Sequence, residues 1–215
     1  MPGTPAADPD RAREEAGRRA RTRLRRYCVE NGLNRLVTLT YEGSGCHDQR
    51  QIRQDVGVFV RSLRRSLGGK PLPYVWVPEW HKTDHGLHMH LALGRYVRRS
   101  LLKAAWDAPG AGFVHIRLLG DLPVGAGRVG EARRAAGYLG KYVTKSFGEE
   151  QRSRSLKRYE VAEGFAPKVL HLTGRSADEV TDMACEYMQA APSTTWNSRE
   201  VEGWKGAPAI ALRWA

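Results

Sequence analysis

The chain has 215 residues, enough for one full domain with additional segments, so it can bury a core of its own. Its net charge of +12 and pI near 10.0 favour a polyanionic partner, nucleic acid above all, because clustered lysines and arginines gain affinity by releasing counterions from phosphates. Cys28, Cys46 and Cys185 are far apart and include no C-x-x-C pair, so they indicate neither a disulfide framework nor a cysteine zinc site.

The N-terminal segment lacks the apolar core of a secretory signal, and no apolar run in the chain approaches the ~18 residues of a membrane span. We therefore expect a cytoplasmic protein with no membrane partner. Residues 1–10 are rich in Pro, Ala and Asp, which predicts a mobile start. Residues 11–26 are dense in arginine and predict a basic helix that either contacts DNA or is simply solvated. We therefore expect residues 1–30 to form a flexible terminus and basic helix, and residues 31–215 to form the main domain with a C-terminal extension.

Elements with clear periodicity follow from residue 35 onward. The stretch RLVTLTYE (residues 35–42) alternates apolar and threonine side chains, which predicts a half-buried strand. Residues 48–67 place apolar side chains at three- and four-residue spacing and predict an amphipathic helix. LPYVWVPEWH and LHMHLAL predict two antiparallel strands joined by the turn KTDHG.

The second half of the chain is less regular. We predict a short helix over residues 100–106, a strand over 113–119, a Gly/Pro loop over 120–127 and a helix over 129–145. Beyond these, a strand over residues 169–172 and a helix over 177–190 are expected, whereas STTWNSREVEGWKG predicts no definite element. The order β-α-β-β-α-β-α indicates an α+β fold.

The strand LHMHLAL carries two histidines that share a face. Because side chains alternate across a strand, His88 and His90 project to one side and Met89 to the other. A tight turn centred between residues 83 and 84 puts Glu79 opposite His88 on that side. Two imidazole nitrogens and a carboxylate oxygen form a donor set typical of a catalytic metal site with open positions.

Alternatives to this site remain open. His81 and His85 are substitutes for Glu79 as the third ligand, and two alternating histidines on a solvent-facing strand are also compatible with no metal at all.

The predicted helix AAGYLGKYVTKSF (residues 135–147) has a second stripe beside its apolar one. Tyr138, Lys141, Tyr142 and Lys145 lie on that stripe, and each tyrosine is followed three residues later by a lysine. A lysine at this spacing can support a phenolate or hold a phosphate, so a tyrosine is a candidate nucleophile for attack on phosphorus. The alternative is a Tyr/Lys face that only covers the domain surface.

LVTLTY, EWHKTDHGLHMHLAL and YLGKYVTK, in that order, resemble the three motifs of rolling-circle replication initiators (Rep proteins) of the HUH endonuclease superfamily, over about residues 35–145. The resemblance implies that His88 and His90 bind Mg²⁺ or Mn²⁺, with Glu79 as the third ligand. It implies a nucleophile in the Y-x-x-K-Y-x-x-K segment, with Tyr142 preferred over Tyr138 and with Lys141 and Lys145 in support. The fold implied is a central antiparallel sheet of about five strands flanked by helices, as in RNA-recognition and ferredoxin-like domains, so residues 31–215 would be an HUH endonuclease domain with an extension.

The function implied is a site-specific single-stranded DNA nickase and strand transferase that forms a 5′-phosphotyrosine and starts rolling-circle replication. Its partners would be an origin hairpin and the replication helicase and polymerase of the host. The alternatives are an HUH transposase or relaxase with the same chemistry, or a non-catalytic nucleic-acid-binding domain. No G-x-x-x-x-G-K-[ST] motif follows these residues, so no attached helicase is expected.

Overall fold

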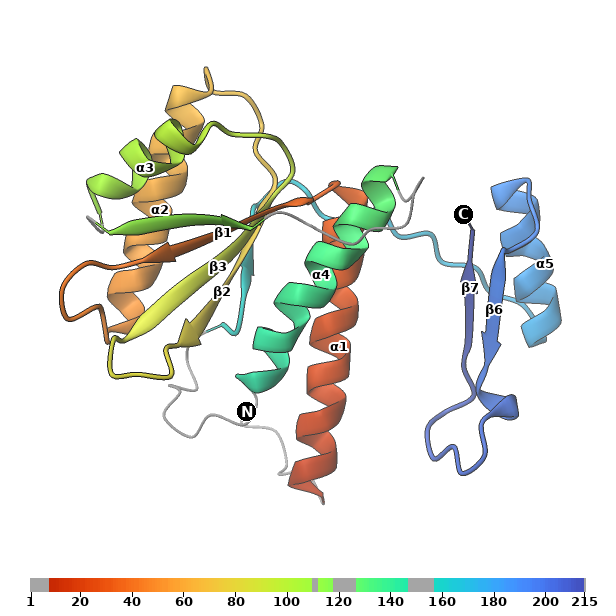
Figure 1. Cartoon of the computed structure of the whole chain (residues 1–215). Helices are drawn as coiled ribbons and strands as arrows, with labels where there is room; N and C mark the ends of the chain where they lie inside the picture. The colour runs from red at the N-terminus through yellow and green to blue at the C-terminus, as the bar shows by residue number, and fades with distance from the viewer. Residues whose placement is uncertain (1–7, 110–111, 118–126, 147–156, 215) are drawn as a thin grey trace, which may run out of the picture. The chain divides into compact units, whose positions relative to one another are not determined.

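A computed structural model describes residues 8–109, 112–117, 127–146 and 157–214 (Figure 1). The chain divides into two compact units, Met1–Pro167 and Lys168–Ala215. The first unit contains a five-stranded antiparallel sheet with helices on both faces. The predicted α+β class and sheet are therefore confirmed.

The sheet of the first unit has the strand order β4-β1-β3-β2-β5, and all neighbouring strands are antiparallel. Its strands are β1 (Arg35–Thr40), β2 (Tyr74–Trp80), β3 (Leu87–Leu93), β4 (Phe113–Arg117) and β5 (Glu160–Val161). The first four were predicted. The two-residue β5 was not, because two residues are too few to show an alternating pattern.

Helices α2 (Gln49–Ser66) and α3 (Arg99–Asp107) cover one face of this sheet, and α1 (Pro9–Glu30) and α4 (Gly127–Lys145) lie on the other (Figure 1). The predicted helices are confirmed with ends shifted by at most four residues. Most of the predicted Gly/Pro loop, residues 120–126, lies outside the described residues.

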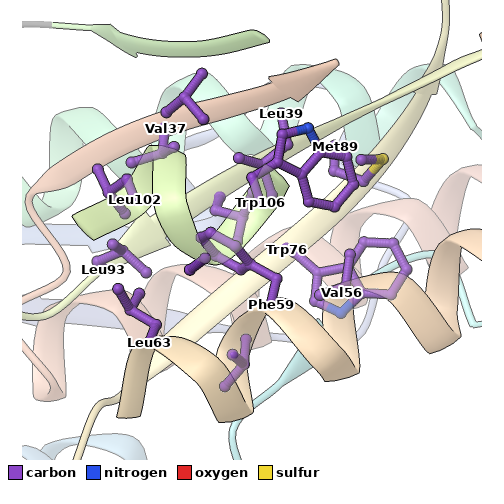
Figure 2. Packing of buried hydrophobic residues seen from close by; sticks show 14 of the residues in the cluster. Val37, Leu39, Val56, Phe59, Leu63, Trp76, Met89, Leu93, Leu102 and Trp106 are labelled. Carbon is purple, nitrogen blue, oxygen red and sulfur yellow. The ribbon is translucent and has the colours of Figure 1, made fainter. Parts of the chain in front are cut away.

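The face under α2 and α3 is a dense apolar core (Figure 2). Phe59 of α2, Trp106 of α3 and Met89 of β3 are fully buried there. The rings of Phe59 and Trp106 pack edge to face with centroids 6.1 Å apart. This core supplies most of the apolar burial that holds the helices to the sheet.

The face under α1 and α4 is built from smaller side chains. Ala135 and Ala136 of α4 and Leu24, Tyr27 and Cys28 of α1 are buried against this side of the sheet. The C-terminal half of α1 is therefore part of the core. The alternative that the basic helix is simply solvated therefore does not hold for the C-terminal half of α1.

The start of α1 also departs from the expectation of a mobile segment through residue 10. The helix begins at Pro9, and the carboxylate of Asp8 accepts a hydrogen bond from the backbone N–H of Arg11 at 3.0 Å. An aspartate N-cap followed by proline in the first turn is a strong start signal, so local chemistry outweighs the disorder-prone composition. Residues 1–7 lie outside the described residues.

The turn between β2 and β3 has the predicted register, with Glu79 opposite His88. Gly86 ends this turn at φ +74°. A Cβ there would overlap the carbonyl of Cys46, so the close approach of the two segments requires glycine. The glycine thus helps to fix the register that aligns the two strands.

The second unit contains α5 (Ala177–Met188), the antiparallel pair β6 (Thr194–Asn197) and β7 (Ile210–Arg213), and a 3₁₀ turn over Ser198–Glu200. Helix α5 was predicted to run two residues further, to residue 190. The predicted strand over residues 169–172 is wrong, because these residues form no strand. Their short apolar run finds no neighbouring strand to pair with, and a run of this length does not specify structure by itself.

Among the described residues, no helix is long and apolar enough to cross a membrane.

Candidate active site

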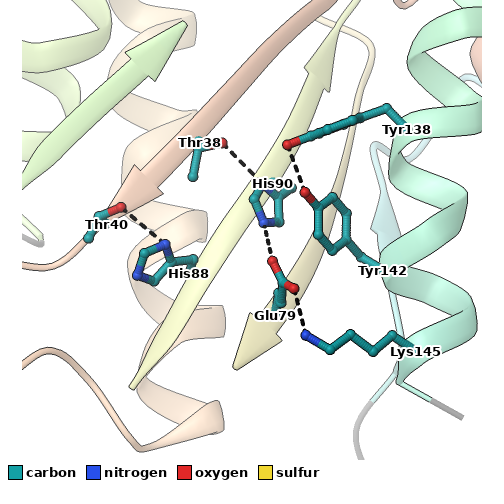
Figure 3. A network of polar contacts seen from close by, with 8 residues as sticks. All are labelled: Thr38, Thr40, Glu79, His88, His90, Tyr138, Tyr142 and Lys145. Atoms are coloured by element: carbon teal, nitrogen blue, oxygen red, sulfur yellow. Dashed lines mark hydrogen bonds and ion pairs between the residues drawn. The ribbon is translucent and has the colours of Figure 1, made fainter. Parts of the chain in front are cut away.

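The two histidines of β3 lie on the sheet face that α4 covers (Figure 3). His90 is only 6% exposed, and His88 is half-buried beside it. The alternative of two histidines on a solvent-facing strand therefore does not hold for His90. A polar side chain at this depth needs partners.

Two threonines of β1 supply the first of these partners. Thr38 Oγ1 lies 3.0 Å from His90 Nδ1, and Thr40 Oγ1 lies 3.5 Å from His88 Nδ1 (Figure 3). Both contacts follow from the pairing of β1 with β3, which sets Thr38 opposite His90. The Nδ1 atoms are thus engaged from β1, and the Nε2 atoms face away from it.

Glu79 of β2 contacts both His90 of β3 and Lys145 of α4. Its Oε2 lies 2.8 Å from His90 Nε2, and its Oε1 accepts a hydrogen bond from Lys145 Nζ at 2.8 Å. In register Glu79 stands opposite His88, but its carboxylate reaches the diagonal neighbour on β3. Burial would raise the pKa of Glu79, yet the hydrogen bonds from His90 and Lys145 outweigh it and lower the pKa.

His88, unlike Glu79, has a buried polar atom, Nε2, without a hydrogen-bond partner among the described residues. Burial and the nearby His81 and His90 lower the pKa of His88 to about 4, so the ring is neutral at pH 7. A neutral imidazole with an unpartnered Nε2 is costly to bury unless a ligand binds it.

The donor set of this site fits a hard divalent cation in chemistry. A threonine oxygen on each Nδ1 is the arrangement that orients a metal-binding imidazole through its other nitrogen. However, the described residues contain no group of three or more His, Cys, Asp or Glu side chains arranged to hold a metal ion. The carboxylate of Glu79 instead contacts His90 and Lys145.

The two alternative ligands lie on the His88 side. The ring of His81 stacks on that of His88 with centroids 4.3 Å apart, and His85 is 6.0 Å from His88. His85 Nε2 lies 3.0 Å from the carbonyl oxygen of Tyr41. Both histidines are therefore near His88, and neither contacts His90.

Helix α4 brings its two tyrosines against His90 (Figure 3). The ring of Tyr142 is stacked on the His90 ring, with centroids 3.9 Å apart and an interplanar angle of 9°. The Tyr142 hydroxyl donates to the Tyr138 oxygen at 2.7 Å. The two hydroxyls, one helical turn apart in sequence, therefore form a pair beside the imidazole.

Arg117, at the end of β4, completes this corner. Its guanidinium carbon lies 4.7 Å from the centre of the Tyr138 ring, a cation–π distance. Burial raises the pKa of Tyr142, and the hydrogen bond to Tyr138 adds to this, whereas the charge of Arg117 acts in the opposite direction. Arg117 therefore favours negative charge on Tyr142.

The two predicted lysines differ. Lys145 reaches Glu79, but Lys141 is exposed, and we find no hydrogen bond or ion pair from it to the cluster in the described part of the chain. The structure thus unites six predicted residues and leaves Lys141 at the rim. The six are Glu79, His88, His90, Tyr138, Tyr142 and Lys145.

Sequence reasoning missed Thr38, Thr40 and Arg117. The threonines carried a signal, because they are the polar half of the alternating strand LVTLTY and so share one face of it. Arg117 carried none, because its place beside Tyr138 depends on how β4 pairs with β1.

Comparison with known protein families identifies a match. The sequence model of the family described as "Replication-associated protein ORF2/G2P" matches residues 34–147, more than half of the chain. This range contains β1 to β4, α4 and every residue of the cluster. No curated protein and no solved structure is significantly similar to the chain. The match over this range shows that the chain belongs to the ORF2/G2P family of replication-associated proteins.

Proposed function

We propose that this protein is an HUH-type replication initiator that nicks single-stranded DNA and rejoins it through a tyrosine. The observation that carries the proposal is the stacking of Tyr142 on His90 within a network that also holds Glu79 and Lys145. A candidate nucleophile and a candidate metal-binding set from separate elements thus meet at one place. Membership of a replication-associated family supports the same reading.

In the proposed reaction, a tyrosine oxygen attacks the scissile phosphorus. The new O–P bond forms as the bond from phosphorus to the 3′ oxygen breaks, which leaves a 5′-phosphotyrosine and a 3′-hydroxyl that takes up a proton. That hydroxyl can prime DNA synthesis. In the second step a strand's 3′-hydroxyl attacks the phosphotyrosine, restores the phosphodiester and releases the tyrosine.

The residues of the chain have distinct parts in this reaction. Tyr142 is the preferred nucleophile and Tyr138 its partner, since their hydroxyls are 2.7 Å apart. Arg117 offsets negative charge that develops on the pair. Lys145 holds Glu79 and brings positive charge to the end of α4, next to the site of a phosphate.

Mg²⁺ or Mn²⁺ is the proposed cofactor. His88, His90 and Glu79 would hold it, and the cation would polarise a non-bridging phosphate oxygen and offset charge on it. Binding requires the carboxylate of Glu79 to exchange its contact with His90 for the cation. The unpartnered Nε2 of His88 supports this assignment.

The proposed substrate is a single-stranded segment of an origin hairpin, with the host helicase and polymerase acting downstream. Charge supports a DNA partner, because the chain carries +12 at pH 7. The second candidate function is non-catalytic nucleic-acid binding, and the lack of a ready three-donor metal group among the described residues favours it. Formation of a covalent adduct distinguishes the two.

Covalent capture of single-stranded DNA tests the proposal. The protein is incubated with Mn²⁺ and a library of single-stranded hairpins, and adducts are read by denaturing gel and by cut position. We expect adducts from the wild type, none from Tyr142→Phe, and some nicking from Tyr138→Phe. Phenylalanine removes the attacking oxygen and keeps the ring on His90, so the fold should be unchanged.

The double variant with both tyrosines replaced should bind DNA without cutting it. Adducts from the double variant would contradict the tyrosine chemistry. Loss of the adduct in Tyr138→Phe alone would reverse the roles of the two residues. A wild type that binds every hairpin but never forms an adduct would favour the non-catalytic candidate.

A further inference from the structure

Two strongly basic helices lie together on the site face of the sheet (Figure 1). Helix α1 has eight arginines and four acidic residues, and α4 has five basic residues and one acidic residue. The two helices together therefore carry a formal charge of +8. Helix α2 on the other face carries +4, from five arginines and one aspartate, so the site face has twice the helix charge of α2.

The two helices run antiparallel. Gly32, just after α1, lies against Arg128 in the first turn of α4, whereas Arg21 contacts Gly140 and Thr144 near its end. Arg21 therefore lies beside the last turn of α4, where Lys145 reaches the active site, and the first half of α1 extends past that turn (Figure 1). Figure 1 shows the two helices side by side on this face of the sheet.

A groove of about 730 Å³ lies along α1 and reaches α4 at Thr144. Its walls include Arg13, Arg18 and Arg21 of α1 and Thr144 of α4, with Gly17 between the arginines. Gly17 is buried, so the floor of the groove at this point is the backbone of α1. The volume is in the range of sites that hold a ligand.

Arg21 is held in this groove by α4. Its Nη1 donates to Thr144 Oγ1 at 2.7 Å, and that hydroxyl in turn donates to the carbonyl of Gly140 at 2.9 Å. A guanidinium has five N–H donors in a rigid fork, so the remaining donors can bind an anion with little further loss of side-chain entropy.

Acidic residues are also present, and their position matters. Asp10 and Glu14 line the groove toward the start of α1, and Asp10 pairs with Arg13 at 3.4 Å in an exposed ion pair. Arg18 and Arg21 lie nearer the end of α4, beyond this pair. The net positive end of the groove is therefore the end that adjoins the active site.

We propose that this groove binds the sugar-phosphate backbone of the single strand that flanks the scissile phosphate, with Arg18 and Arg21 as phosphate contacts. The inference rests on the proposed function only for the identity of the substrate. Thr144 and Lys145 are consecutive residues, so the groove reaches the same turn of α4 as the side chain that holds Glu79. Phosphate contacts of this kind position a strand without reading its sequence.

The test is the salt dependence of binding to a fluorescent oligothymidylate, measured by anisotropy in EDTA so that no cleavage occurs. Each neutralised phosphate contributes roughly 0.7 to the negative slope of log affinity against log salt on single strands. Arg18→Gln combined with Arg21→Gln should therefore reduce the slope by about 1.4 and weaken binding at low salt. Arg18→Gln alone, at an exposed position, should reduce it by about 0.7.

The matched control replaces Arg61 and Arg64 of α2 by glutamine. These arginines are exposed, have the same three-residue spacing and lie on the helix that covers the other face of the sheet. The control should keep the wild-type slope, and lysine at positions 18 and 21 should largely restore it. Equal slopes for wild type and the Arg18/Arg21 variant would overturn the proposal, as would an equal drop in the control.

A duplex probe and the adduct assay separate the remaining outcomes. If the Arg18/Arg21 variant loses affinity for duplex but not for oligothymidylate, the groove binds a hairpin stem and the single-strand proposal is wrong. If the wild type forms adducts while the slopes do not differ, the groove fails and the proposed function stands. If the slopes differ as expected and no hairpin yields an adduct, the groove stands and the nicking function fails.

Discussion

The two faces of the sheet differ in the side chains that they bury. Under α2 and α3 the side chains are large and apolar, and under α1 and α4 small apolar residues surround a row of polar ones. Both rows come from the same strands, because successive residues of β1 and β3 point to opposite faces. The comparison teaches that one face supplies stability and leaves the other free to hold polar groups that are expensive to bury.

The largest expected effect is on the apolar face. Phe59→Ala removes a fully buried ring that packs on Trp106, and we expect it to lower the free energy of unfolding by about 3–5 kcal/mol. Urea denaturation measures this loss. Val58→Ala, at a neighbouring position that is 37% exposed, is the control and should change stability by less than about 0.5 kcal/mol. Equal losses would mean that α2 does not pack as described.

A smaller stability effect is expected at the centre of the polar face. His90→Ala removes the partner of Thr38 and of Glu79 and the ring on which Tyr142 stacks, so we expect a loss of about 1–3 kcal/mol. The same denaturation experiment measures it. His88→Ala is the comparison, because its Nε2 makes no bond that can be lost. Both variants should lose nicking, and nicking by either would remove that histidine from the site.

The pH dependence of stability should reveal His88 in metal-free protein. Its pKa is lowered to about 4 in the folded chain from an ordinary 6.5, so the unfolded chain binds more protons between these values. Stability should therefore fall as pH falls from about 6.5 to 4, and His88→Gln should flatten this part of the curve. Thermal melts in EDTA over this range are the measurement. An unchanged curve in the variant would assign the pH dependence to other groups.

The smallest effect on stability is expected from Glu79→Gln. The amide oxygen can still accept from Lys145, and the amide can still pair with His90, so the fold should be nearly unchanged. Mn²⁺ affinity, measured by calorimetry, should fall, but less than in His88→Ala. Unchanged affinity would instead point to His81 or His85 as the third ligand, and both lie on the His88 side.

Contacts between residues close in the sequence could be predicted, whereas contacts between distant segments could not. The register of β2 and β3 could be predicted, because a short turn fixes which residues face each other, and Glu79 does stand opposite His88. The contacts of the Glu79 carboxylate with His90 and Lys145 could not be predicted, because Lys145 comes from a helix and lies 66 residues away in the sequence. The same limit explains why Arg117 was missed and why Lys141 was included.

Weak periodicity accounts for the strands that the sequence did not predict. Strand β5 has two residues, and the pair β6 and β7 falls in a segment with no alternating pattern. Among the described residues of the second unit, Ser198 alone is buried, and no side chain of α5 is fully buried. A segment without a core places few constraints on its sequence, so its pattern predicts little.

The sequence by itself determined the α+β order, the face that the two histidines share and the stripe on which both tyrosines lie, because each depends on residues within a few positions of one another. The tertiary structure alone decided that Tyr142 stacks on His90, that Thr38 holds His90 Nδ1 and that α1 and α4 form one charged groove. Such contacts join segments 50 to 120 residues apart, roughly, and the packing of helices on the sheet sets them rather than any local repeat.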